Sequence, residues 1–442
     1  MTPLRQSDTD ACPGALRLHA AADGLLARVR LPAGVLSGAQ LRVLRELTEQ
    51  FGDGFLELTS RANLQVRGVR AEDAETLAAR LRAAGLLPSA THDAVRNIAA
   101  PPLAGPALRA LTSQLDTALL GDPALSRLPG KFLFAIGHVP LAADVAAVPA
   151  RPAPGGVPER FAIRLGGHDA GIRVDGETVV PTMLAAAHAF LAEREAQRSG
   201  GPAAWRLREL TDGPSRVAAR VRAALGPTTA DTEPIGPVEA LEPGDLLGVL
   251  DQPGSPLVAV GALVPLGRLG GVPMRVLEKA TRLVITPWRG VLVTDLPRAD
   301  AAQWADQLID SGLALAADSP WVGVTACAGR PGCAKSLADV RADATRAARF
   351  VDGLPVHWVG CARACGSPAG RHVQVQATPT GYQVSRPNSG ATTGANTGTD
   401  AETDTVTDTM INPDTVDPDT VDPDTDDPSR DLGAVVATAR RP

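Results

Sequence analysis

The chain has 442 residues, of which 44% are hydrophobic and 3% aromatic, and its formal net charge is −6. This length predicts more than one domain, with cores filled mainly by Leu, Val and Ala. No apolar run approaches the ~18 residues of a membrane span. The polar residues 1–11 lack a signal-peptide core, and basic residues are dispersed rather than gathered in a patch. We therefore expect a cytoplasmic protein with neither membrane nor nucleic acid as partner.

Residues 31–88 predict a unit of helix, strand, turn, strand and helix. Leu41, Leu44 and Leu47 have helical spacing, and alternating apolar residues at 56–58 and 64–66 indicate two strands. The pattern returns later in the chain, where residues 31–47, 56–69 and 77–88 resemble residues 264–280, 283–296 and 304–315. A duplicated α+β half with a cleft between the copies is predicted.

The segment between the copies predicts strands at 131–139 and 160–166 and a helix at 182–198. The chain ends in a tail from about residue 387, whose centre is the repeat PDTVDPDTVDPDTDDP at 413–428. Such a composition of proline, acid and threonine buries too little apolar surface to offset the entropy of ordering. The tail, residues 387–442, is therefore predicted to be disordered.

Four of the five cysteines, Cys327, Cys333, Cys361 and Cys365, have the spacing C-x5-C…C-x3-C. In a reducing cytosol such a group indicates metal binding rather than disulfides. Four thiolates are the usual ligands of a 4Fe–4S cubane, whereas a structural zinc site usually pairs its cysteines as C-x2–4-C. The spacing favours the 4Fe–4S cluster, with zinc as the rival. Cys12 stands apart and is expected to be a small core residue.

These motifs together resemble the nitrite and sulfite reductase-like family. The cysteine pattern follows a duplicated half, and three further stretches have the family's character: ELTSRANLQVRG (57–68), VRNIAA (95–100) and LPGKFLFAIG (128–137). Within the family, residues 11–34, 51–68 and 92–105 resemble the precorrin-3B synthase branch. One departure supports that branch, because Leu133 stands where sulfite reductases have a second lysine.

The resemblance implies an α+β fold with duplicated ferredoxin-like half-domains and reductase-type α/β domains around a central cleft. It predicts five parts: a first half at 10–105, a first α/β domain at 106–236, a second half at 237–320, the iron–sulfur part of a second α/β domain at 321–386, and the tail at 387–442. It further implies that Arg61, Arg96 and Lys131 bind substrate carboxylates, for which an arginine fork is well suited.

The implied activity is an oxygen-dependent monooxygenase of cobalamin biosynthesis that converts precorrin-3A to precorrin-3B, by hydroxylation and γ-lactone formation. Dioxygen and an electron donor, NADH or a redox protein, would be its partners. An additional mononuclear non-haem iron is implied, but the scattered histidines offer no ligand set for it. The alternatives are a sirohaem-dependent nitrite or sulfite reductase and a non-catalytic iron–sulfur electron carrier. The sequence singles out no catalytic residue.

Overall fold

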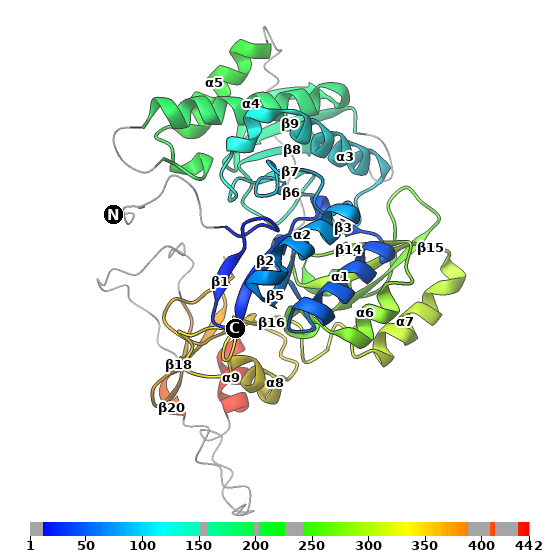
Figure 1. Cartoon of the computed structure of the whole chain (residues 1–442), viewed down its shortest axis with the longest axis vertical. Helices are drawn as coiled ribbons and strands as arrows, with labels where there is room; N and C mark the ends of the chain where they lie inside the picture. The colour runs from blue at the N-terminus through cyan, green and yellow to red at the C-terminus, as the bar shows by residue number, and fades with distance from the viewer. Residues whose placement is uncertain are drawn as a thin grey trace, which may run out of the picture.

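A computed structural model describes residues 12–150, 158–198, 203–225, 242–368, 370–387, 407–411 and 432–441. Within these ranges it contains four five-stranded sheets with helices packed against them. Figure 1 shows three levels: an α/β domain with α3, α4 and α5 at the top, a central pair of half-domains with α1, α2, α6 and α7, and a third level with α8 and α9. The predicted α+β class is confirmed.

The first half-domain contains one antiparallel sheet, with strands of different lengths, and two helices pack on it. Its strands are β1 (His19–Ala21), β2 (Gly24–Val29), β5 (Leu64–Val69) and β4 (Leu56–Leu58), and its helices are α1 (Gly38–Phe51) and α2 (Ala74–Ala83). Ser37 caps α1 through a reciprocal capping box with Gln40. Leu41, Leu44 and Leu47 are buried on the sheet as their spacing predicts.

The second half-domain repeats this arrangement, so the predicted duplication is confirmed. Its strands are β11 (Gly248–Asp251), β12 (Val258–Leu263), β15 (Gly290–Leu296) and β14 (Arg282–Ile285), and its helices are α6 (Gly271–Leu277) and α7 (Ala301–Asp310). Both copies break register at one place in the pairing of the same two strands, β2 with β5 and β12 with β15. Positive φ angles also recur, at Ala62 (56°) and Arg289 (61°) and at Gly68 (73°) and Asp295 (62°).

The two half-domains exchange their shortest strands. β3 (Val35–Leu36) of the first copy pairs with β14 of the second, and β13 (Arg268–Leu269) pairs with β4 of the first. The approach is close: a side chain at Gly38 would put its Cβ 2.3 Å from the carbonyl oxygen of Ala280. Buried residues of both copies consequently form one continuous hydrophobic core.

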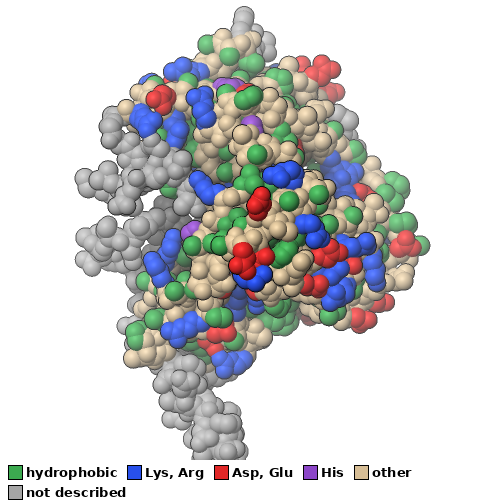
Figure 2. All heavy atoms as spheres, viewed as in Figure 1, with side chains coloured by type: hydrophobic (Ala, Val, Ile, Leu, Met, Phe, Trp, Pro, Cys, Tyr) green, Lys and Arg blue, Asp and Glu red, His purple; other side chains and the backbone are tan. Residues whose placement is uncertain are grey.

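Charged side chains of both signs interleave over α1, α6 and α7, at the right of the view in Figure 2. Several of them bridge the two copies. Arg45 on α1 places its Nε 2.9 Å from Glu278 Oε2, and Arg275 on α6 places its Nη2 3.3 Å from Glu49 Oε1. The exposed pair of Arg275 with Glu49 stabilises the fold only slightly, so the shared core and the exchanged strands are the main connection between the copies.

The other two sheets share a topology: three parallel strands followed by antiparallel ones. One contains β6 (Ile98–Ala99), β7 (Phe134–Ile136), β8 (Val145–Pro149), β9 (Arg160–Leu165) and β10 (His168–Asp175), with helices α3 (Pro106–Gly121), α4 (Gly176–Ala196) and α5 (Gly213–Leu225). The other contains β16 (Val324–Ala326), β17 (Val356–Val359), β18 (Val373–Thr378), β19 (Gly381–Ser385) and β20 (Thr407–Ile411), with helices α8 (Val340–Ala347) and α9 (Leu432–Arg440). β6, which precedes residue 105, pairs with β7 in the first of these sheets.

The prediction of a disordered tail over 387–442 is wrong for two segments. Residues 407–411 form β20, which pairs with β19. Residues 432–440 form α9, in which Val436 and Ala439 are buried against the fourth sheet. The guanidinium of Arg440 donates hydrogen bonds to the carbonyl oxygens of Leu354 (2.8 Å) and Val322 (3.0 Å). The acidic repeat at 413–428 lies outside the described residues.

None of the helices within the described ranges combines the length and the apolarity needed to cross a bilayer.

Candidate functional site

The four cysteines of the paired motif lie in two neighbouring loops. Cys327 follows β16 directly and Cys361 comes two residues after β17, and these strands are adjacent and parallel. Carboxyl ends of parallel strands meet at one edge of a sheet, so both loops begin side by side. Cys333 and Cys365 lie further along the same loops. The two loops span 327–339 and 360–372. They are longer than the corresponding loops of the sheet β6–β10, which span 100–105 and 137–144.

The four thiols lie close enough together for the charge of one to change the pKa of another. Burial raises the pKa of the Cys365 thiol, and the neighbouring Cys327, Cys361 and Cys333 raise it further, while Arg363 opposes them. All five cysteines are among the described residues, and none is in a disulfide. Within the described ranges, no three His, Cys, Asp or Glu side chains are placed to hold a single metal ion.

The backbone around the thiols suits sulfur ligands that must accept hydrogen bonds. The Gly360 N–H donates to Cys327 Sγ over 3.3 Å. A side chain at position 360 would put its Cβ 1.8 Å from Ser336 Oγ, so the two loops approach more closely there than any residue but glycine permits. A set of four thiols with N–H···S bonding and close glycine backbone fits an iron–sulfur cluster.

Two arginines hold the Cys327–Cys333 loop, Arg67 from β5 of the first half-domain and Arg341 from α8. Arg341 Nε donates to the Cys327 carbonyl oxygen (3.1 Å), and Arg67 Nη2 donates to that of Gly332 (2.7 Å). Both guanidiniums are near the buried Glu57, whose Oε1 is 2.6 Å from Arg341 Nη2 and 3.8 Å from Arg67 Nε. Strands β4 and β5 therefore position a loop that lies more than 250 residues later in the chain.

His357 binds the backbone of the second cysteine loop. The ring is fully buried, its Nδ1 is 2.8 Å from Thr325 Oγ1, and its Nε2 donates to the Cys365 carbonyl oxygen over 3.0 Å. Burial lowers the pKa of His357 to about 3, so the ring is neutral and keeps its proton on Nε2. This role could not be predicted, because nothing in the sequence spacing distinguishes His357 from the other histidines.

Arg61 is presented by the tight turn between β4 and β5. Thr59 Oγ1 accepts from the Asn63 N–H (3.1 Å), which closes the turn. Burial and the nearby Arg206 lower the pKa of Arg61. Among the described residues, its guanidinium makes no hydrogen bond or ion pair. A half-buried cation of this kind is suited to bind an anion that the described residues do not supply.

Arg289 is the corresponding group of the second copy, in the turn between β14 and β15. Burial lowers its pKa, although Glu57 acts in the opposite direction. A Cβ at Gly366 would lie 3.8 Å from Arg289 Nη2, so this arginine lies beside the Cys361–Cys365 loop. Sequence reasoning missed it. The signal was the repeat itself, which aligns Arg289 with Ala62, the residue after Arg61.

Lys131 and Arg61 belong to different domains, and both lie near the pair Trp205–Arg206. Lys131 Nζ lies 4.8 Å from the ring centroid of Trp205, which directly precedes Arg206. The buried Asp144 binds Arg206 Nε (2.8 Å) and accepts from the Leu133 N–H (2.9 Å). Arg206, another residue that the sequence did not reveal, thus lies between the segment of Lys131 and Arg61, whose pKa it lowers by charge repulsion.

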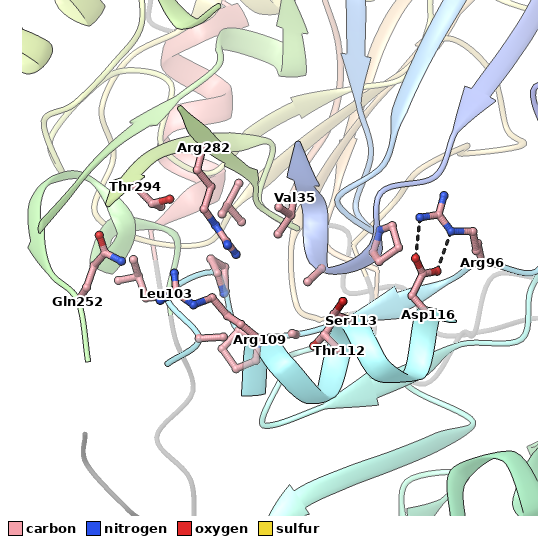
Figure 3. A pocket seen from close by; sticks show the side chains of 17 residues that line it. Val35, Arg96, Leu103, Arg109, Thr112, Ser113, Asp116, Gln252, Arg282 and Thr294 are labelled. Atoms are coloured by element: carbon pink, nitrogen blue, oxygen red, sulfur yellow. Dashed lines mark hydrogen bonds and ion pairs between the residues drawn. The ribbon is translucent and has the colours of Figure 1, made fainter. Parts of the chain in front are cut away.

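The structure does not turn Arg96 toward Arg61 and Lys131. Its Nε and Nη2 donate two hydrogen bonds to the carboxylate of Asp116 on α3, at 2.7 and 2.8 Å. Both residues line a separate pocket (Figure 3). The next residue, Asn97, faces the Lys131 segment, where its Nδ2 donates to the Gly130 carbonyl oxygen over 2.8 Å.

Cys12 differs from its expected place in a core. It is only half-buried, and it lies close enough to Arg61 to influence the pKa of that group.

Comparisons with known proteins agree with this architecture. Residues 19–84 match the model of the nitrite/sulfite reductase ferredoxin-like half domain. A ferredoxin–nitrite reductase of Synechococcus elongatus is 28% identical over 384 residues, covering 78% of this chain and 74% of the relative. A precorrin-3B synthase of Sinorhizobium is 27% identical over 395 residues, covering 84% and 81%. The structure of the NirA protein of Mycobacterium tuberculosis matches with a TM-score of 0.66 at 20% identity, over 82% of this chain and 74% of that one.

Proposed function

We propose that this chain, a nitrite/sulfite reductase-like protein with a ferredoxin-like half domain at residues 19–84, is an oxidoreductase that carries a 4Fe–4S cluster beside a tetrapyrrole-binding surface. The ligands would be Cys327, Cys333, Cys361 and Cys365. The observation that carries the proposal is the juxtaposition of Arg289 with the Cys361–Cys365 loop, which brings an unpaired cation next to the thiols.

The residues around the thiols have defined tasks in this proposal. A bound cluster supplies one-electron transfer. The Gly360 N–H stabilises negative charge on Cys327 Sγ, and Arg341 and Arg67 fix the carbonyl oxygens of the first loop. His357 holds the Cys365 carbonyl oxygen as a neutral donor. Fixed donors of this kind set the orientation and the potential of a metal centre.

The substrate cations in the proposal are Arg61, Lys131 and Arg289. Each arginine offers a planar fork that can hold a carboxylate with two parallel hydrogen bonds. A precorrin bears several carboxylates, so cations from both half-domains can share one ligand. Arg96 is left out of this set because its fork already binds Asp116.

The finer proposal is the oxygen-dependent conversion of precorrin-3A to precorrin-3B. Leu133 supports it: the side chain two residues after Lys131 is apolar and buried, whereas reduction of a small oxyanion requires concentrated positive charge. The Sinorhizobium precorrin-3B synthase also matches a larger share of both chains than the Synechococcus nitrite reductase does. NADH or a redox protein would supply electrons.

The alternative is a sirohaem-dependent nitrite or sulfite reductase. It is favoured by the nitrite reductases among the relatives, at up to 28% identity. It is also favoured by the exposure of Cys365, since an exposed thiolate beside Arg289 can face a bound haem. A non-catalytic electron carrier is the third candidate, but it has no use for the unpaired arginines.

One preparation separates the three candidates. The full chain is purified without oxygen and analysed for iron, sulfide and visible absorption, then incubated with precorrin-3A, dioxygen and a reductant. We expect about four irons and four sulfides, no sirohaem bands, and a product heavier by one oxygen atom. Strong sirohaem bands with nitrite consumption would establish the alternative. Failure to bind any tetrapyrrole would leave the electron carrier.

A further inference from the structure

A pocket of about 310 Å³ lies between α3 and the second half-domain (Figure 3), and none of its lining residues is a cysteine. Its floor is α3, its roof is β14 and β15, and the segment Pro32–Val35 of the first half-domain closes one side. Arg282 and Arg109 extend into it toward each other. Its volume is at the lower end of the range for small-molecule sites.

The pocket lies against the second half-domain at the position where the first half-domain contacts the Cys327–Cys333 loop. Matching register makes Thr294 on β15 the counterpart of Arg67 on β5, because Val293 and Val66 occupy the same place in their ladders. Arg67 binds the carbonyl oxygen of Gly332 in the long loop after β16. The corresponding loop after β6 is the short segment 100–105, which lines the pocket instead of filling it.

Two polar groups at this place make no hydrogen bond to a described residue. The Thr294 hydroxyl and the Arg282 Nε are buried and make no hydrogen bond. The nearest carboxylate oxygen to Arg282 is Asp295 Oδ2, at 3.8 Å from Nε. Leaving such groups without a hydrogen bond destabilises the fold, and a ligand can remove that cost.

The charges around the pocket leave a surplus of one cation. Asp116 is neutralised by Arg96. Asp295 Oδ1 accepts from Gln252 Nε2 (2.9 Å) and from Arg109 Nη1 (3.1 Å), and Oδ2 accepts from the same Arg109 Nη1 (3.4 Å), so this carboxylate is shared mainly with Arg109. Arg282 therefore adds a positive charge that no carboxylate of the described protein balances. The remaining walls are apolar and include Pro101, Leu103 and Val284.

We propose that this pocket binds a small organic anion, a carboxylate on a short apolar body, with the carboxylate on the Arg282 guanidinium and the body against the apolar wall. The fork of Arg282 provides two donors for the carboxylate. The pocket is built from both half-domains, so occupancy links them and stabilises the fold by mass action. The site is independent of the proposed redox function.

The test is calorimetric titration of the full chain at low salt with butyrate and with benzoate, together with thermal unfolding at each concentration. We expect dissociation constants on the order of 1 mM or lower and a rise in Tm. Neutral 1-butanol should not bind, and inorganic phosphate should bind more weakly because it lacks an apolar body.

Two variants locate the site. Arg282→Gln removes the charge and should weaken binding by roughly tenfold or more. Ser113→Phe blocks the pocket from an exposed position of α3 and should abolish binding with folding intact. The exposed Arg298→Gln in the same half-domain is the matched control and should bind like the parent.

Three outcomes would overturn the proposal. In the first, neither butyrate nor benzoate binds at concentrations tens of times the expected dissociation constant. In the second, binding persists in both Arg282→Gln and Ser113→Phe, which would place it elsewhere. In the third, phosphate binds more tightly than both carboxylates, which would show that the ligand class is wrong.

Discussion

Arg61 and Arg289 are held at equivalent turns of the two half-domains, and burial lowers the pKa of both. Neither guanidinium has a hydrogen bond or ion pair with another described residue. Both side chains are half-buried, and charges that are partly withdrawn from water without a partner are costly to a fold. Two of them in corresponding turns, one beside the Lys131 group and one beside the cysteine loops, indicate that an anionic ligand contributes to the stability of this region.

Replacing Arg61 should weaken tetrapyrrole binding without loss of the cluster. Loss of a charged hydrogen-bond partner in a partly buried site costs ~1.5–3 kcal/mol, or roughly tenfold to over a hundredfold in affinity. Arg61→Lys should also bind worse, because it keeps the charge but loses the fork. Titration of cluster-replete Arg61→Ala, Arg61→Lys and Arg289→Ala with precorrin-3A measures this. The exposed Arg275→Ala serves as control, and unchanged affinity in all Arg61 and Arg289 variants would disprove the assignment.

Cys361→Ser should abolish the brown absorbance and the acid-labile sulfide of anaerobically purified protein. Serine offers a hard oxygen in place of the soft thiolate that iron–sulfide clusters favour. Cys12→Ser is the matched control, and its iron and sulfide should equal those of the parent. Stoichiometric zinc without sulfide in the parent protein would contradict the cluster assignment.

At the residue scale, the sequence predicted side chains that belong to contiguous motifs better than those that act across the fold. The four cysteines were recognisable because ligand spacing is local. Arg206 and His357 were not, because their roles depend on contacts with Asp144 and with the Cys365 carbonyl oxygen. Arg96 was recognised as a motif residue, yet its partner Asp116 lies twenty residues later on α3, and that pairing decides where its guanidinium points.

Among the elements, α9 shows that the last residues of the chain are part of the fourth sheet's packing. Arg440→Ala should lower the free energy of unfolding by on the order of 2–4 kcal/mol, because its guanidinium satisfies buried carbonyl oxygens of four residues. Urea unfolding of this variant and of the neighbouring Arg441→Ala measures the difference. Arg441 is exposed and should behave like the parent; equal loss in both variants would contradict the packing of α9.

The contact between α4 and α5 should weaken in acid. Glu193 on α4 is buried and binds Arg216 Nε (2.6 Å) and Arg220 Nε (2.5 Å) on α5. These hydrogen bonds lower the pKa of Glu193 from 4.5 to about 2. A carboxyl whose pKa is depressed by folding stabilises the fold above 4.5, and this contribution is lost as the pH falls toward about 2.

Thermal unfolding of the parent and of Glu193→Gln across that pH window tests the assignment. The parent should lose stability on acidification more steeply than Glu193→Gln, which has no carboxyl to protonate at this position. Parallel pH profiles would show that Glu193 does not contribute.

Regular elements were predictable where periodicity was strong. The helix expected at 182–198 is found at 176–196, and α1 begins where Ser37 and Gln40 form the capping box. The two-residue strands β3 and β13 were not predictable, because they are defined by partners more than 200 residues away. Helix α9 was missed for a different reason: the acidic repeat before it dominates the composition of the tail, whereas LGAVVATAR on its own has an apolar face.

For the whole molecule, the shared core predicts that neither half is stable alone. Segment 12–225 lacks β13 at the edge of its sheet, and segment 242–441 lacks β3. Each would expose the buried residues that the other covers. Expressed separately, both segments should be insoluble or lack a cooperative thermal transition, whereas co-expression should give a soluble complex. Cooperative unfolding of either segment alone would contradict this prediction.

A single copy of the half-domain would have to borrow its missing edge strand from another molecule. Two identical chains that lend this strand to each other form a symmetric, domain-swapped dimer, whose stability depends on protein concentration. In a single chain that carries both copies, the association is intramolecular and no longer depends on protein concentration. The two copies can then differ, because a change in one is not repeated in the other. The cysteine-bearing loops after β16 and β17 and the short segments after β6 and β7 are one such difference.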